Sequence, residues 1–323
     1  MTRRARLLFV ALLAALFLGN LDQVCADDWP ARSIRLLITT PAGGSPDFVG
    51  RLVGDKLAQR LGKPIVVENT NIQGLPALNG VVRANPDGYL LVVLTGGLST
   101  LAAMQKTMPF SLETDLTMIS FLVRYPMVVT VANDSPYKTL AELIAASKEK
   151  PEGLTFAMNL PGSLHHFVGE LINIESGANL RGIPYRGSTQ MLTDLLGRRV
   201  DAMIDTGTSA IPQVHAGAIR GLAVSSADRF PLAPEIPAIS ESVKGVAATS
   251  WLGLAGPPGL PKPILDRLNK EIREIMELPD VRERLAVTGN LPMVSSPEEM
   301  RQTILSEIAQ WQRVVKDKNI ETR

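Results

Sequence analysis

The stretch TTPAGGSPDFVGRLVGDKLAQRLG, residues 39–62, joins the end of a β-rich run, IRLLIT, to a glycine turn and then to a helical pattern. Within it, Ser45 is a suitable N-cap and Pro46 suits the first helical position. The free N–H groups of a helix start favour a carboxylate or a phosphate, and Gly43 and Gly44 let the backbone come close to it. The loop has neither the Gly-Lys-Ser/Thr of a P-loop nor a Gly-x-Gly-x-x-Gly pattern. It therefore predicts either an anion site without a nucleotide motif or a plain, well-capped turn.

Further loops of the same kind strengthen the first alternative. Four loops rich in Gly, Ser and Thr follow predicted strands, at residues 95–100, 159–166, 185–190 and 205–210. Like the first loop, each lies at the step from strand to helix, so all five are expected at the carboxyl ends of strands. In open α/β sheets this is where ligands bind. Converging backbone amides and hydroxyls suit a small carboxylate held by neutral donors.

Strand and helix patterns alternate along most of the chain. The predicted strands are 33–40, 64–68, 87–95, 122–134, 154–158, 181–185, 200–205 and 219–225. The predicted helices are 46–61, 76–84, 139–150, 163–175, 188–197, 208–216, 263–277, 280–287 and 297–317. The last helix starts with Ser296 and Glu299 placed as a capping box. This alternation predicts an α/β fold with mostly parallel strands.

The first 26 residues are typical of a secretory signal peptide. Three arginines precede an apolar run at 7–18, and small residues precede a cleavage point after Ala26. The run is shorter than the roughly 20 residues that span a membrane. A lipoprotein alternative would acylate Cys25, but Asp22 stands where such signals carry Leu. We expect export to the periplasm.

Bulk composition excludes several classes of function. Hydrophobic residues make up 45% and charged residues 20% of the 323 residues, which is ordinary for a globular protein. Removing the signal takes away three Arg and one Asp, so the net charge of +1 becomes −1 and nothing indicates nucleic-acid binding. Because Cys25 is the only cysteine, the mature chain has no disulfide and no thiol chemistry.

The chain resembles the Bug family, the periplasmic solute receptors of tripartite tricarboxylate transporters. The resemblance covers essentially the whole mature chain and rests on the order and spacing of loose motifs. These include WPARSIRLLITTPAGGSPDFVGRLV, LGKPIVVEN, NPDGYLLVV, GSLHHFVGEL, IPYRGSTQMLTDLLGRRVDAMID and TSWLGLAGPPGLPKPILDRLNKEI. It implies a two-lobed periplasmic-binding-protein fold, of the Venus flytrap, type II kind, with a ligand cleft between the lobes. We expect lobe 1 at 27–122 and 229–323, and lobe 2 at 123–228.

The resemblance also implies which residues hold a carboxylate. First-lobe contacts would be Ala42, Gly43, Gly44, Ser45 and Asp47, with Gly96 and Gly97 nearby. Second-lobe contacts would be Gly162, Ser163, His166, Arg186, Gly187, Asp205 and Thr208. No cofactor or metal is implied, and the receptor is expected to be a monomer that hands its ligand to a membrane permease.

The chain departs from the family pattern near this site. Pro46 replaces a Thr, which removes one hydroxyl and one N–H, and Thr70 replaces an Arg. His165 stands where a small residue is usual, and Arg186 follows Tyr185 where the family has Lys. These changes leave the identity of the carboxylate open: dicarboxylates, tricarboxylates, aromatic acids and amino acids all remain candidates.

For several of these residues, a structural role is the alternative to ligand binding. His166 either lines the site or has a structural role, and Asp47 either holds a ligand group or complements the helix dipole. Arg186 either pairs with a second carboxylate or makes a salt bridge, and Asp205 either orients loop amides or reads a ligand hydroxyl. His166 and Glu170, at i and i+4, supply only half of a metal site.

Two other functions compete with solute capture. A sensor would use the same cleft and dock a membrane partner when closed. A periplasmic hydrolase would need a nucleophile beside a base, and Ser163 near His165 and His166 is the one suggestive pair. No Gly-x-Ser-x-Gly elbow is present, so we predict a binding protein and no enzyme.

Overall fold

The computed structural model describes residues 29–70 and 75–317, and the predicted signal peptide, 1–26, lies outside the described residues. The strands are β1 (Ile34–Ile38), β2 (Ile65–Asn69), β3 (Leu90–Thr95), β4 (Thr117–Ala132), β5 (Leu154–Met158), β6 (Leu180–Pro184), β7 (Ala202–Thr206), β8 (Ile219–Val224), β9 (Thr249–Gly256) and β10 (Leu291–Pro292). The helices are α2 (Ser45–Leu61), α3 (Leu75–Val82), α4 (Gly97–Met104), α5 (Leu140–Glu149), α6 (Leu164–Ser176), α7 (Ser188–Leu196), α8 (Gly207–His215), α9 (Ile239–Ser242), α10 (Lys262–Glu277), α11 (Pro279–Val287) and α12 (Pro297–Asp317).

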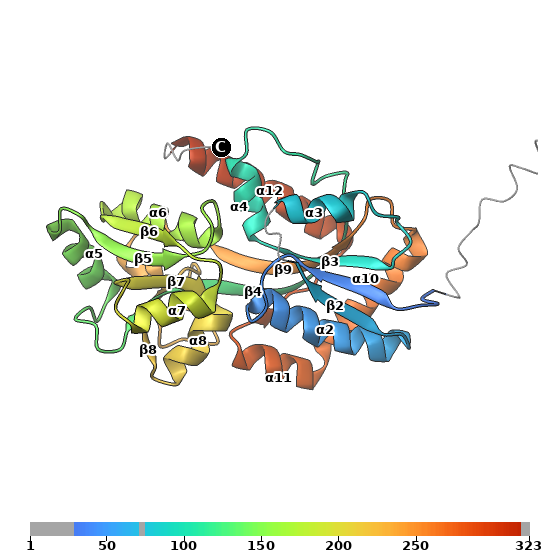
Figure 1. Cartoon of the computed structure of the whole chain (residues 1–323), viewed down its shortest axis with the longest axis horizontal. Helices are drawn as coiled ribbons and strands as arrows, with labels where there is room; N and C mark the ends of the chain where they lie inside the picture. The colour runs from blue at the N-terminus through green and yellow to red at the C-terminus, as the bar shows by residue number, and fades with distance from the viewer. Residues whose placement is uncertain (1–28, 71–74, 318–323) are drawn as a thin grey trace, which may run out of the picture.

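The strands form two halves joined by the long strand β4 (Figure 1). Their order is β2-β1-β3-β9-β4-β7-β5-β6, with β8 and β10 also paired to β4. Residues 117–126 of β4 pair with β9, and residues 127–132 pair with β7 and β8. We call the part around β1, β2, β3 and β9 the first half, and the part around β5 to β8 the second half.

The predicted parallel pairing holds only away from the junction of the halves. The pairs β1–β2, β1–β3, β5–β6 and β5–β7 are parallel. In contrast, β4 and β9 run antiparallel to their neighbours, and both the strand β9 and the helix α4 were absent from the sequence prediction. The parallel strands of the two halves therefore lie on opposite sides of the antiparallel pair β9–β4.

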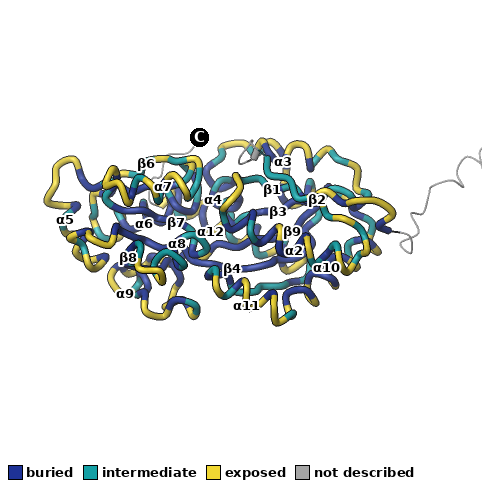
Figure 2. Tube along the Cα trace, turned by 60° about the horizontal axis from the view of Figure 1, so that its bottom comes forward, coloured by how far each residue is buried: buried dark blue, intermediate teal, exposed yellow. Residues whose placement is uncertain are grey.

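Burial follows the sheet through both halves. The strands run as a buried interior, and exposed residues gather on the outer helices and loops (Figure 2). One core cluster extends from Ile34 and Leu36 of the first half to Phe156 and Phe167 of the second. The nearly continuous burial of β3 and β4 is expected for strands that are covered by helices on both faces, whereas β1 alternates between buried and more exposed residues.

The C-terminal helix α12 contacts both halves. Its N-terminus is fixed by the predicted capping box, because Glu299 N donates to Ser296 Oγ at 3.2 Å and Ser296 N donates to Glu299 Oε2 at 2.7 Å. Near its C-terminus, Trp311 meets Phe167 of α6 edge-on, with ring centroids 5.3 Å apart. In Figure 1, α12 lies above the junction, beside α4.

The segment after β8 packs with the second half. Phe230, Ala233 and Ile236 share a buried cluster with Val128 and Ile211. The chain bonds back to the first half only afterwards, at β9. This packing favours a return to the first half near residue 249 rather than at the predicted residue 229. No helix in the parts of the chain that the structure describes is long and apolar enough to cross a membrane.

Candidate ligand-binding site

A cavity of about 920 Å³ lies between the two halves. Each of the five predicted Gly/Ser/Thr-rich loops contributes to its wall: Gly44 and Thr95 from the first half, and Gly162, Gly187 and Thr206 from the second. The loops were predicted at the carboxyl ends of strands, and the structure confirms this position for all five and brings them together around one cavity. A cavity of this size at the junction of two units is typical of a small-molecule site.

The first-half wall is the loop between β1 and α2. Gly43 has a left-handed φ of +91°, which favours glycine, and Gly44 is extended and forms the N-cap. Ser45 was predicted to cap the helix, but it is already the first helical residue. Among the described residues, the N–H groups of Gly44 and Ser45 have no acceptor, because the first intrahelical bond runs from Phe48 N to Gly44 O. These two donors lie at the positive end of the helix dipole, where they favour an anion.

Ser45 uses its hydroxyl for a different purpose. Its Oγ donates to Oδ1 of the fully buried Asn290 at 3.1 Å, and Asn290 Nδ2 donates to Thr208 Oγ1 at 2.9 Å. Thr208 lies in α8 of the second half, so Asn290 connects the anion loop of one half with a helix of the other. This link explains why Ser45 does not cap α2 and why Thr208 does not reach the cavity wall.

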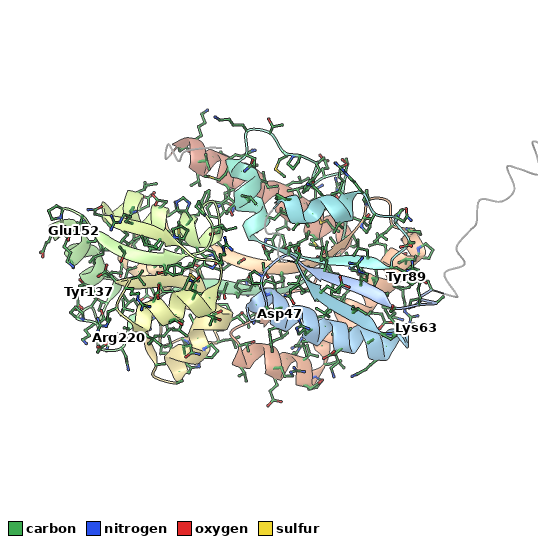
Figure 3. The ribbon with its side chains drawn as sticks, in the orientation of Figure 1. Asp47, Lys63, Tyr89, Tyr137, Glu152 and Arg220 are labelled. Atoms are coloured by element: carbon green, nitrogen blue, oxygen red, sulfur yellow. The ribbon has the colours of Figure 1, made fainter. Side chains whose placement is uncertain are left out.

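Asp47 closes the loop from behind. Its Oδ2 accepts from Gly43 N at 3.0 Å, and its Oδ1 accepts from Arg51 Nε at 2.9 Å. Burial alone would raise the pKa of Asp47, but the hydrogen bonds from Gly43, Arg51 and Asn69 outweigh it and hold the pKa below its ordinary value. In Figure 3, Asp47 lies in the middle of the molecule, whereas Tyr89 and Tyr137 lie toward opposite ends.

The lowered pKa of Asp47 leads to a prediction about stability. An ionised Asp47 stabilises the fold above its unfolded-state pKa, and this contribution is lost as the pH falls through the lower folded-state pKa. We expect Asp47→Asn to reduce the free energy of unfolding by about 1–2 kcal/mol at pH 7, since it removes charge-assisted hydrogen bonds. Denaturant unfolding at pH 7 and near pH 3 measures this; an equal deficit at both pH values would contradict it.

The second-half wall begins with the loop before α6. Gly162 has a left-handed φ of +87°, and its N–H donates to His166 Nδ1 at 3.2 Å. Thr100 of α4 donates from Oγ1 to Gly162 O at 3.0 Å, which ties this loop to the first half. His166 therefore shapes the loop from outside the cavity, and its Nε2 lies 3.7 Å from Glu170 Oε1. Its neighbour His165 lines the cavity instead.

Asp205, at the end of β7, is buried behind the same wall with 1% exposure. Its Oδ1 accepts from Ser188 Oγ at 3.0 Å and from Thr206 N at 2.7 Å, while Oδ2 has no partner among the described residues. Ser188 and Thr206 both line the cavity. Asp205 thus lies behind the cavity wall and orients the Ser188 hydroxyl and the Thr206 N–H.

The cavity wall is electrostatically one-sided. Among the described residues that line it, Arg186 is the only Lys or Arg, and none is Asp or Glu. Arg186 is exposed and has no hydrogen bond or ion pair within residues 29–70 and 75–317, so its guanidinium is available to a ligand. Together with the helix starts of α2, α6 and α7, this arrangement favours an anion.

The floor contains residues that the sequence gave no reason to select. Tyr125 and Met127 of β4 and Ser250 of β9 line the cavity, and Tyr125 stands opposite Ser250 in the antiparallel register. Burial is the main reason that the pKa of Tyr125 rises to about 12; a hydrogen bond with Ser250 lowers it, and the charge of Asp205 raises it further. Tyr125 is therefore a neutral phenol at any working pH.

The predicted site residues divide into two groups. Those on the cavity wall are Ala42, Gly43, Gly44, Ser45, Gly97, Gly162, Ser163, Arg186 and Gly187. Those beside or behind the wall are Asp47, Gly96, His166, Asp205 and Thr208. Most of the second group hold the wall in shape through the hydrogen bonds given above; Gly96 packs directly against Ser250 and Trp251, where a Cβ would lie 2.8 Å from Ser250 Oγ. Within the part of the chain that the structure describes, no cluster of three metal-ligating side chains occurs.

Comparison with known families and structures identifies similar proteins. Residues 49–320 match the tripartite tricarboxylate transporter family receptor. The periplasmic binding protein BugD is similar in fold, with a TM-score of 0.85 and 29% identity over 91% of this chain and 100% of BugD. The fold of the chain is therefore that of a two-lobed periplasmic binding protein, as expected.

Two other solved structures contain bound acids. Rpa4515 of R. palustris, solved with adipate, is 30% identical, with a TM-score of 0.85 over 90% of this chain and 99% of Rpa4515. MatC (Rpa3494) from Rhodopseudomonas palustris, solved with malate, is 27% identical with a TM-score of 0.80 over 89% of this chain and 100% of MatC. Proteins similar to this chain thus bind aliphatic carboxylates.

Proposed function

This chain belongs to the tripartite tricarboxylate transporter receptor family, and from that premise we propose that it captures a small organic carboxylate between its lobes and delivers it to a membrane permease. The family and its structural neighbours are binding proteins and not enzymes. The chain is exported through the signal at 1–26 and works in the periplasm. It needs no cofactor.

The observation that carries this proposal is the anion-receptive wall. Gly44 and Ser45 of one lobe, with their unaccepted N–H groups, line the same cavity as Arg186 and the start of α6 of the other, and no described lining residue is a carboxylate that would repel an acid. The bound adipate and malate of similar proteins agree with a carboxylate ligand. The carboxylate is assigned to the β1–α2 loop because its donors are fixed by the backbone and not by flexible side chains.

Ligand capture follows from the position of the cavity between the lobes. Of the described residues, lobe 1 comprises 29–70, 75–126 and about 249–317, and lobe 2 comprises about 127–248, so that β4 and β9 form the connection. A ligand that bonds to both walls makes its full set of contacts only when the lobes are closed, and it therefore shifts the population toward the closed state. The hydrogen bonds from Ser45 through Asn290 to Thr208 also join the two lobes.

A thermal-shift screen of residues 27–323 tests the proposal. The panel holds adipate, malate, citrate, benzoate and glutamate, each beside its amide or ester. A ligand at a hundred times its Kd stabilises the folded state by about 2.7 kcal/mol, which is readily detected. We expect at least one acid to raise Tm while its neutral analogue does not. No shift with any acid, or equal shifts with acid and amide, contradicts the proposal.

A further inference from the structure

A second polar cluster lies in the lobe 2 wall, beside the proposed carboxylate site. His165 lines the cavity with its side chain only 9% exposed, and Asp205 stands directly behind it at 1% exposure. Nε2 of His165 lies 3.5 Å from Asp205 Oδ1, which is ion-pair distance, and 3.4 Å from Asn159 Nδ2. The other ring nitrogen, Nδ1, is buried and has no partner within the described chain.

The buried carboxylate has a single basic neighbour. A charge as deeply buried as Asp205 needs a partner of opposite sign, and no Lys or Arg reaches it in the described structure. Its hydrogen bonds come from Ser188 and Thr206, which are neutral. His165 is therefore the group that can supply a positive charge, by taking up a proton.

The ring geometry sets what His165 offers to a ligand. The tautomer that carries its hydrogen on Nε2, next to Asp205, leaves Nδ1 as a bare acceptor, and a carboxylate cannot bond to it. A proton on Nδ1 converts that nitrogen into a charged donor, and the hydroxyl of Ser163 in the same wall is buried without a partner and can complete the contact. An anion bound beside Asp205 also adds negative charge, which favours this proton.

We propose that His165, positioned by Asp205, is a second anion-binding group of the cleft, and that the ligand carboxylate and one proton bind together. This inference rests on the proposed function. The other charged or titratable groups around the ring are Tyr125 on β4 and Arg186 before α7, together with His166 and Glu170 on α6 itself. Tyr125 stays neutral between pH 5 and 8, because burial raises its pKa to about 12.

Calorimetry with adipate and with malate tests the coupling. Each acid is titrated into residues 27–323 at pH 6, 7 and 8, in two buffers of different ionisation enthalpy, so that protons taken up on binding are counted directly. We expect uptake at pH 7 and a Kd that is about fivefold or more higher at pH 8 than at pH 6, because the carboxylate and the proton bind together. His165→Asn is expected to bind more weakly at pH 6 and to take up no proton, and Asp205→Asn to lose the uptake as well.

Matched variants separate the possible outcomes. His215→Asn removes an exposed histidine that is paired with Glu235 and does not line the cavity, and it is expected to keep the full proton uptake. The titration of the acid itself is common to all variants and cancels in the comparison. Binding without uptake, or uptake that survives in His165→Asn, overturns this inference and leaves the proposed function intact. If neither acid binds the unmodified chain, the titrations are repeated with the acid that gives the largest thermal shift; no binding of any acid of the panel at any pH overturns both.

Discussion

Replacing Gly44 by Asp is expected to weaken carboxylate binding at least about a hundredfold, because a like charge placed beside a bound anion costs several kcal/mol. Gly44 lines the cavity and precedes α2 with φ −93° and ψ 177°, a conformation open to any residue. A Cβ there meets only Pro46 Cδ, at 3.6 Å, which is an ordinary contact. The introduced carboxylate sits at an N-cap and takes the donors that the ligand needs, so the helix is kept while the site is lost.

The control for this prediction is Gly44→Ala, which adds the Cβ without the charge. We expect it to bind the same acid with a Kd within about threefold of the original, since both backbone donors remain. Calorimetry gives the affinity, and thermal unfolding without ligand shows that both variants are folded. If Gly44→Asp binds as well as Gly44→Ala, the carboxylate does not sit at the β1–α2 loop.

Replacing Phe167 by Ala is expected to lower the free energy of unfolding by about 3–5 kcal/mol, the usual cost of deleting a large buried aromatic ring. Phe167 is fully buried in α6 and meets Trp311 of α12 edge-on, with centroids 5.3 Å apart. The cavity left by the ring therefore opens between a lobe 2 helix and the C-terminal helix. Guanidinium unfolding followed by circular dichroism measures the loss.

An exposed aliphatic residue provides the matched comparison. Val287 ends α11 with 68% exposure, and Val287→Ala should change the free energy of unfolding by no more than about 0.5 kcal/mol. If Phe167→Ala costs as little as Val287→Ala, the contact between α6 and α12 does not hold these helices together. A separate early transition in Phe167→Ala alone would show that the two lobes unfold independently.

Local signals in the sequence were sufficient for the loops of the site. Pro46 after a glycine pair predicts a helix start, and Ser296 with Glu299 predicts a capping box, because both patterns act over a few residues. The position of all five loops at the carboxyl ends of strands follows from the alternation of strands and helices. These features place most of the wall without any knowledge of long-range contacts.

Long-range pairing limits the rest of the prediction. Ser45 has the right chemistry for an N-cap, but its hydroxyl bonds to Asn290, 245 positions away, and no local pattern shows this. Tyr125 and Ser250 reach the cavity through the antiparallel pair of β4 and β9, which the parallel reading of the sheet did not include. Their place on the floor depends on register, and register is set by the fold as a whole.

For His165 and His166, the sequence contains a signal, the helical periodicity of apolar residues, that distinguishes the two and that the prediction of the site residues did not use. Successive helical residues point about 100° apart, so only one of the two can face a given wall. His165 shares the buried side of α6 with Val168 and Ile172, at i+3 and i+7, whereas His166 shares its side with Glu170. This periodicity favours His165 for the wall.

The measurement that tests the central claim most directly is a crystal structure of residues 27–323 with the acid that gives the largest thermal shift. We predict one carboxylate within hydrogen-bonding distance of Gly44 N and Ser45 N, with the rest of the ligand between α4 and the start of α6, and with the lobes closed around it. A carboxylate bound elsewhere, with the β1–α2 loop in contact only with solvent, would contradict the account.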